Sequence, residues 1–168
     1  EVMRGMQEKA RRGGYQAAIP LGYQYNGPGT IPSVIEAEAS IIRYIFQAYA
    51  EQGLDRTAIA RRLNDSGKRT KRGNLYEKRN IEYVLKNPFY IGKIRWNRAP
   101  HSSYQENPED EIIIADGAHE PIIAQELFER ANTRLRSESR TAKSRSVSAC
   151  RHWLSGLVRC SVCGASLS

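Results

Sequence analysis

A short predicted helix, residues 77–86, carries side chains of the kinds that bind nucleic acid. Arg79, Tyr83 and Lys86 fall on one line of this helix, and Asn80 lies beside them. In a major groove, Arg reads guanine edges, Asn reads adenine and Lys contacts phosphate oxygens. The residues of this helix that we predict to contact DNA are Lys78, Arg79, Asn80, Tyr83 and Lys86. A solvated basic face on an ordinary helical bundle is the alternative interpretation.

Basic residues are also concentrated in two segments outside this helix. They are Lys68, Arg69, Lys71 and Arg72 in the loop that precedes the helix, and Lys9, Arg11 and Arg12 near the N-terminus. Clusters of this kind match the electrostatic footprint of a nucleic-acid-binding surface, in which phosphate contacts supply much of the affinity. The loop cluster is therefore predicted to contact DNA.

The sequence Cys160-Ser-Val-Cys163-Gly164 has the spacing of a zinc knuckle. A tight turn lets two thiolates reach one metal ion, and glycine permits that turn. A structural zinc site needs four ligands, so we interpret Cys160 and Cys163 as half a site whose two further ligands lie outside the chain. A thioredoxin-like redox pair belongs in a βαβ unit, which the sequence does not predict. Two incidental thiols are the remaining alternative, and Cys150 is expected to be a free thiol.

His101, His119 and Glu120 could in principle bind a metal or transfer protons. They lie in predicted loops and lack the spacing of a metal site or a catalytic triad. We therefore interpret the two histidines as surface or structural residues. The sequence contains no glycine-rich phosphate loop and no nucleophile paired with a base, so no active site is predicted.

Apolar residues at helical spacing predict the elements that would position these groups. Asp55 is a suitable N-cap for the second helix, and Gly53 and Gly67 stand where the first and second helices should stop. We expect Tyr76, just ahead of the third helix, to be buried. The predicted helices run from residue 36 to the stop at Gly53, and over residues 56–66, 77–86 and 126–136.

Two small β-hairpins are predicted as well. The first turns at residues 26–29, and the second pairs residues 90–98 with residues 111–115. The predicted fold class is therefore α+β, a mainly helical domain with a helix-turn-helix-like three-helix core and small hairpins. Residues 137–150 are rich in Ser, Lys and Arg, which predicts a flexible linker. Residues 151–168 would form the first part of a zinc ribbon.

The composition favours an anionic partner. The 168 residues include 26 Lys and Arg against 18 Asp and Glu, a formal net charge of +8. This balance suggests nucleic acid before a membrane surface. No run of about 20 apolar residues is present, and the first residues resemble neither a signal nor a transit peptide. Three cysteines form no disulfide framework, so we expect a cytoplasmic protein.

Several stretches, in order along the chain, resemble the recombinase domain of large serine recombinases, the integrases of phages and transposons. The sequence Leu85-Lys-Asn-Pro-Phe-Tyr-Ile-Gly92 is one of them. The others are residues 20–23, 38–49, 59–67 and 119–123, with Phe128 following. Residues 154–164 are similar to the start of that family's zinc ribbon. The resemblance covers essentially the whole chain.

This resemblance implies the DNA-binding part of a site-specific recombinase. Residues 1–14 would end the linker helix from a catalytic domain with a serine nucleophile, and residues 15–136 would form the recombinase DNA-binding domain. The basic residues 9, 11 and 12 would lie near a minor groove, and the third helix would lie in the adjacent major groove. The chain alone would be inactive, and zinc is expected in the full-length protein.

The implied partners are double-stranded attachment-site DNA and other recombinase subunits in a synaptic complex. The chain itself is expected to be monomeric, and its origin bacterial or phage. A basic RNA-binding module with a zinc knuckle is the alternative, although the aromatic stacking platform of single-strand binders is missing. A metal-dependent nuclease is a third reading, against which stands the lack of a visible cluster of acidic ligands.

Overall fold

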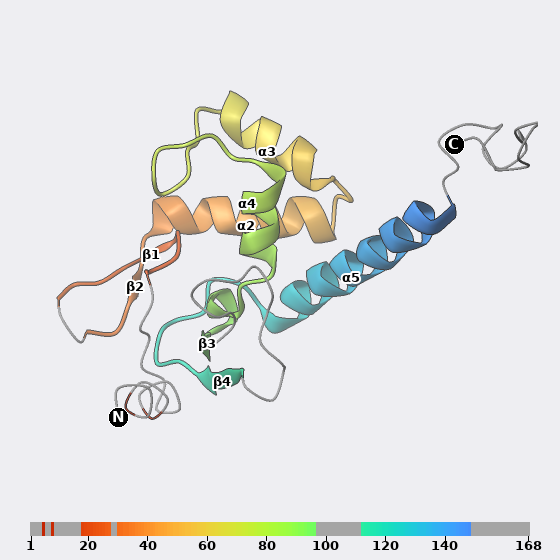
Figure 1. Cartoon of the computed structure of the whole chain (residues 1–168). Helices are drawn as coiled ribbons and strands as arrows, with labels where there is room; N and C mark the ends of the chain where they lie inside the picture. Colours follow the sequence, from red (N-terminus) through yellow and green to blue (C-terminus); the bar gives the residue numbers. More distant parts are fainter. Residues whose placement is uncertain (1–4, 6–7, 9–17, 28–29, 97–111, 149–168) are drawn as a thin grey trace, which may run out of the picture. The chain divides into compact units, whose positions relative to one another are not determined.

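The computed structural model describes residues 5, 8, 18–27, 30–96 and 112–148 (Figure 1). The chain divides into two compact units, residues 1–132 and 133–168. The described part of the first unit combines helices with two short antiparallel hairpins, which confirms the predicted α+β class. No helix in the described ranges is long and apolar enough to cross a membrane.

Three helices, α2 (Glu36–Ala50), α3 (Arg56–Asp65) and α4 (Lys78–Leu85), pack against one another (Figure 1). The apolar residues of α2 recur at helical spacing and are buried, as predicted: Ala39, Ile41, Ile42, Ile45, Phe46 and Tyr49. Ile59 and Leu63 of α3 and Ile81 and Leu85 of α4 complete this core. Burial of these side chains is the main stabilising contribution to the arrangement.

The ends of α3 follow the predicted signals. The Asp55 carboxylate accepts hydrogen bonds from the backbone N–H groups of Thr57 (2.6 Å) and Ala58 (3.0 Å), and these bonds hold the pKa of Asp55 below its ordinary value. Gly67 ends the helix with φ +75°, and its N–H donates to the Asn64 carbonyl. Both predicted stops, Gly53 and Gly67, have positive φ.

The first hairpin joins β1 (Tyr23–Gln24) to β2 (Ser33–Val34), as predicted. Gly22, just ahead of it, has φ +95°, and a Cβ atom there would lie 2.8 Å from Cδ1 of Ile122. Its N–H donates to the Glu38 carboxylate at 2.8 Å. This position therefore requires glycine, because it combines a left-handed backbone with close packing.

The second hairpin differs in part from the prediction. β3 (Lys93–Trp96) pairs with β4 (Ile113–Asp116), but residues 88–91 form a 3₁₀ helix, η1 (Pro88–Ile91), instead of extending the strand. The Asn87 side chain accepts a hydrogen bond from the Phe89 N–H at 3.2 Å, and Pro88 favours the first turn. Gly92 ends that turn with φ +78°.

The prediction of a flexible linker over residues 137–150 is wrong for the described residues. Helix α5 (Gln125–Ser148) continues through residue 148. Once the amphipathic first part of α5 has formed, each added residue extends an existing helix without a new nucleation step, and Arg134 pairs with Glu138 one turn on at 2.9 Å. Within the first unit, α5 is tied down by Asn132, whose amide donates to the Leu85 carbonyl at 3.0 Å.

Candidate nucleic-acid interface

The outward face of α4 carries a preorganised pair of side chains, Arg79 and Tyr83. The Arg79 guanidinium lies 5.5 Å from the centre of the Tyr83 ring, and its Nη2 donates to the Tyr83 hydroxyl at 3.1 Å. Tyr83 is 46% exposed, whereas Ile81 and Leu85 on the opposite face are fully buried. Contact with an aromatic ring restricts the orientation of a guanidinium. The pair therefore presents an oriented cation on the exposed side of the helix.

Lys86, predicted to lie on the same line, is held by the protein itself. Its Nζ lies 2.7 Å from Oε1 of Glu82, and the second oxygen of Glu82 lies 2.7 Å from Nη1 of Arg56 on α3. The hydrogen bond from Lys86 is the largest cause of the lowered pKa of Glu82, which Arg56 and Lys78 also favour. Glu82 thus fixes α4 against α3.

Asn80 also has a structural role at the start of α4. Its Oδ1 accepts a hydrogen bond from the backbone N–H of Glu77 at 2.8 Å, in a capping box. The oxygen is therefore turned toward the start of the helix, and the amide N–H groups are the end presented to a ligand. In this orientation Asn80 is placed as a hydrogen-bond donor.

The basic loop ahead of α4 divides into engaged and uncommitted cations. Arg69 donates to the carbonyls of Asn64 (3.2 Å) and Lys68 (2.8 Å). The side chains of Lys68 and Arg72 are exposed and make no hydrogen bond or ion pair with the described residues. A turn closed by the Gly73 N–H and the Thr70 carbonyl at 2.8 Å holds the loop in shape. Lys68 and Arg72 are thus the loop cations best placed to meet phosphate.

Lys71 fastens the loop to the segment that precedes the first hairpin. Its Nζ donates to the carbonyls of Ile19 (3.3 Å), Pro20 (3.3 Å) and Tyr23 (3.0 Å). An ammonium group has three N–H donors, so these three carbonyls use all of them. Lys71 was predicted as a DNA contact, and its geometry here is that of a clamp inside the protein. Its role toward DNA stays a prediction.

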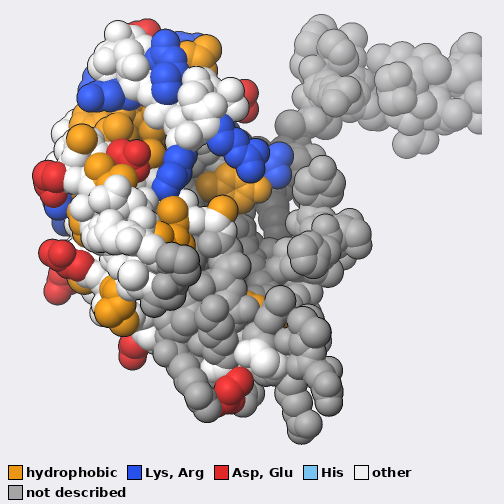
Figure 2. Space-filling view, turned by 90° about the vertical axis from the view of Figure 1, so that its left-hand side faces the viewer, with side chains coloured by type: hydrophobic (Ala, Val, Ile, Leu, Met, Phe, Trp, Pro, Cys, Tyr) orange, Lys and Arg blue, Asp and Glu red, His pale blue; other side chains and the backbone are white. Residues whose placement is uncertain are grey.

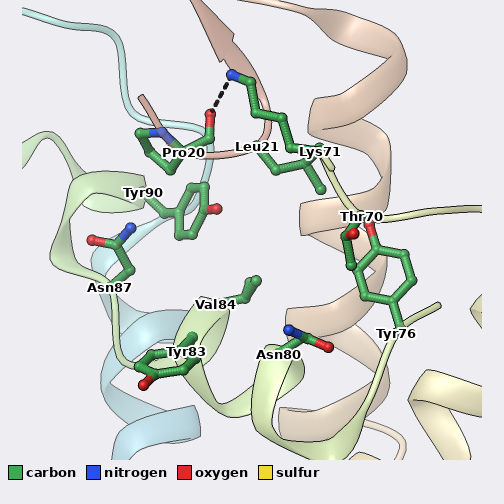
Figure 3. A pocket seen from close by; sticks show the side chains of 10 residues that line it. All are labelled: Pro20, Leu21, Thr70, Lys71, Tyr76, Asn80, Tyr83, Val84, Asn87 and Tyr90. Atoms are coloured by element: carbon green, nitrogen blue, oxygen red, sulfur yellow. Dashed lines mark hydrogen bonds between the residues drawn. The ribbon is translucent and has the colours of Figure 1, made fainter. Parts of the chain in front are cut away.

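A pocket of about 210 Å³ opens between this clamp and α4 (Figure 3). Asn80, Tyr83 and Val84 contribute from α4, and Lys71 contributes from the loop. The predicted burial of Tyr76, which also lines the pocket, is confirmed at 4% exposure. Among the described residues its hydroxyl has no hydrogen-bond partner, and burial raises its pKa to about 12.

His119 is a structural residue, which is one of the two alternatives, surface or structural, that the sequence predicts. Its ring stacks on Phe89 with a centroid distance of 3.7 Å, and its Nε2 lies 2.7 Å from the Phe89 carbonyl oxygen. Burial lowers its pKa, and the carbonyl hydrogen bond partly opposes that change. Within the described ranges no group of three or more His, Cys, Asp or Glu could hold a metal ion.

Several predicted site residues lie outside the described part of the chain. These are Lys9, Arg11, Arg12, His101, Cys150, Cys160 and Cys163. Their predicted roles in minor-groove binding and zinc coordination therefore stay predictions.

The face shown in Figure 2 gathers Lys and Arg side chains over the upper part of the described surface, next to exposed hydrophobic side chains. Asp and Glu side chains lie mainly along its edge. Cations interleaved with apolar groups suit a duplex, which presents phosphates outside and base edges in its grooves.

Sequence reasoning missed two groups that shape this site. Asn64 pairs with the backbone of Tyr76 in both directions, accepting from its N–H at 2.8 Å and donating to its carbonyl at 3.0 Å. The Arg56–Glu82 pair joins α3 to α4. Neither spacing has a local signature, because the partners are 12 and 26 residues apart. By contrast, the Glu77-x-x-Asn80 cap has a local spacing that could have been recognised.

Comparisons with known proteins agree with this geometry. A family model described as Recombinase matches residues 36–138. The crystal structure of an LSR–DNA complex, LSR denoting large serine recombinase, has a TM-score of 0.61 and 23% identity; the match covers 98% of this chain and 47% of that one. A structure concerning the sequence requirements of the Listeria innocua prophage attP site has a TM-score of 0.58 and 23% identity, covering 99% and 64%. The chain spans less than two thirds of either matched chain.

Proposed function

Because the chain belongs to the Recombinase family, whose model matches more than half of it, we propose that it is the DNA-binding part of a site-specific recombinase and recognises one attachment half-site. The observation that carries this proposal is the exposed Arg79–Tyr83 pair on α4. This pair lies on the side of α4 opposite its buried apolar face. The loop ahead of α4 adds Lys68 and Arg72, whose exposed side chains have no partner among the described residues. A short helix of this kind fits a major groove.

The contacts divide into two classes with different consequences. Lys68, Arg72 and Lys78 supply phosphate contacts, which give affinity and salt dependence without reading sequence. Arg79 supplies the base contact, because a guanidinium on the exposed side of α4 is the side chain that suits the O6 and N7 atoms of guanine. Lys9, Arg11 and Arg12 would add minor-groove contacts where the chain crosses the backbone.

The first experiment measures binding of the chain to the attachment half-sites that flank its parent element, and to scrambled duplexes of the same composition. Titrations at 100 and 250 mM salt separate the two classes of contact. A half-site preference that persists at the higher salt supports base readout. Equal and equally salt-sensitive binding to both duplexes contradicts it. Duplex RNA and single-stranded RNA serve as competitors, and a preference for either would favour the RNA-binding alternative.

The partners and the metal belong to the same proposal. The chain acts as a monomer on one half-site, and further recombinase subunits join it through regions of the longer protein. Zinc would be held by Cys160 and Cys163 with two further ligands, because two thiolates fill only half of a tetrahedral site. That metal would be structural, fixing the fold of residues 151–168 and taking no part in strand cleavage.

A further inference from the structure

The pocket beside α4 combines an unpaired donor, a buried hydroxyl and an apolar wall. It lies next to the proposed recognition pair, since Tyr83 lines it. In Figure 3 the side chains of Asn80 and Val84 from α4 stand across the pocket from Pro20 and Leu21. Its three walls come from the N-terminal segment, the basic loop and α4, so the fold rather than a single element builds it.

The polar groups of the pocket define what it can bind. The oxygen of the Asn80 amide is turned to the Glu77 N–H, from which it accepts a hydrogen bond at 2.8 Å. In Figure 3 the nitrogen is turned toward Val84 and the oxygen away from it. The buried hydroxyl of Tyr76 has no partner among the described residues. The orientation of the Asn80 amide therefore favours a ligand that brings a hydrogen-bond acceptor.

The charge of Lys71 does not make the pocket a phosphate site. Its three N–H donors are spent on the carbonyls of Ile19, Pro20 and Tyr23. No other cationic side chain lines the pocket within the described residues. A neutral base edge fits this lining better than a phosphate, which takes charge-assisted bonds from free cations.

The apolar wall selects among the bases. Leu21 and Val84 are partly buried and, with Pro20, line the pocket close to the Asn80 amide. In the major groove only thymine places a methyl group beside a single acceptor, O4. Guanine and adenine offer acceptors without a methyl group, and cytosine offers a donor.

We propose that this pocket reads a thymine of the bound duplex. The Asn80 amide nitrogen donates to O4, and the C5 methyl group packs against Val84 and Leu21. The inference rests on the proposed DNA binding and adds to it a specificity-determining contact separate from that of Arg79.

The test replaces each thymine of the preferred half-site, one at a time, by deoxyuridine, which removes only the methyl group. At one position binding should weaken about fourfold, the value expected for one buried methyl-sized group. The variant Val84→Ala should abolish the difference between thymine and uracil at that position. Circular dichroism and thermal unfolding of each variant confirm that it is folded.

A second substitution tests the hydrogen bond. Asn80→Asp keeps an oxygen for the Glu77 N–H but replaces the donor by an acceptor. It should weaken binding to the thymine site about tenfold and favour 5-methylcytosine, which has the methyl group and an amino donor, at the same position. The matched control is Asn87→Asp, which changes another amide of the pocket lining while the oxygen that caps Phe89 is kept.

The outcomes separate this inference from the proposed function. If the half-site is preferred over scrambled duplex but no deoxyuridine position matters and Asn80→Asp shows no switch, the thymine pocket is wrong and DNA readout stands. If neither duplex is preferred, both proposals fail. A deoxyuridine effect that survives unchanged in Val84→Ala also overturns the assignment, because the methyl group would then contact another residue.

Discussion

At the scale of single residues, chemical type alone does not decide which cations meet DNA. Lys71 and Arg72 are neighbours in one basic loop and equally good candidates by sequence. The structure gives Lys71 three carbonyl partners and leaves Arg72 exposed without a hydrogen bond to the described residues. A cation whose donors are satisfied inside the protein has little to gain from a phosphate. The two residues should therefore differ in their response to salt.

We predict that Arg72→Met makes the slope of log affinity against log salt concentration less steep by about 0.9, the value for one lost phosphate contact. Lys71→Met should leave that slope unchanged and instead lower the free energy of unfolding by about 1 kcal/mol, because it removes charge-assisted hydrogen bonds from three carbonyls. Fluorescence titrations between 50 and 300 mM salt and urea unfolding measure both. If both variants reduce the salt dependence of affinity equally, Lys71 must exchange its carbonyl partners for phosphate when the protein binds DNA.

The outward residues of α4 could be predicted from the sequence, and their partners could not. Helical spacing correctly placed Arg79 and Tyr83 on one exposed face. The partners of Lys71 are carbonyls 48 to 52 residues away. Because every residue has a backbone carbonyl, the sequence does not indicate which carbonyls Lys71 will contact. The capping role of Asn80 has a local signature, because Asn80 lies three residues after the N-cap Glu77.

At the scale of elements, one ion pair joins α4 to α3. Arg56 and Glu82 are 2.7 Å apart, with side-chain exposures of 16% and 34%. The Glu36–Arg43 pair within α2 is a natural comparison, because its side chains are 74% and 40% exposed. Screening by water weakens an ion pair, so the less exposed pair should be the stronger of the two.

A double-mutant cycle with Arg56→Met and Glu82→Gln should give a coupling energy of about 1 kcal/mol in urea unfolding. The matched cycle with Arg43→Met and Glu36→Gln should give a smaller coupling energy. Similar coupling energies in the two cycles would mean that the interhelical pair contributes no more than a surface pair. The orientation of α4 would then depend on Ile81 and Leu85 alone.

Element prediction succeeded where apolar periodicity was strong and failed where it was weak. The ranges of α2, α3 and α4 follow from buried side chains at helical spacing and from Asp55, Gly53 and Gly67. Residues 137–148 carry almost no apolar stripe, and the helix there continues the amphipathic part that precedes it. Residues 90–91 are apolar enough for a strand, but the cap at Asn87 and the proline after it favour a 3₁₀ turn.

At the scale of the first compact unit, one aromatic cluster joins segments that are distant in the sequence. Tyr23 contacts Phe89 edge-on at 4.9 Å and His119 edge-on at 5.4 Å. Phe46 extends the cluster to Phe128 at 5.9 Å. The Tyr23 hydroxyl also donates to the Glu120 carbonyl at 2.7 Å, across 97 residues of sequence. Such contacts join the ends of this body to its middle, and no local pattern could have predicted them.

His119 makes the stability of this body dependent on pH. The ring is 4% exposed and stacks on Phe89, and burial holds its pKa below the ordinary value of 6.5. A group whose pKa is lower in the folded state takes up protons preferentially when unfolded, so acid favours unfolding. The contribution of the neutral ring is therefore complete above about pH 6.5 and is lost as the pH falls below that value.

We predict that the free energy of unfolding falls between pH 7.5 and pH 5.5 in the parent chain, and that His119→Gln removes most of this fall even though the variant is less stable at pH 7.5. The glutamine amide can still donate to the Phe89 carbonyl but takes up no proton in this range. Urea unfolding at four pH values measures the change, with His101→Gln as the control that should keep the parent's pH dependence. If His119→Gln keeps it as well, the proton is taken up elsewhere, and the stacked ring contributes to stability through packing alone.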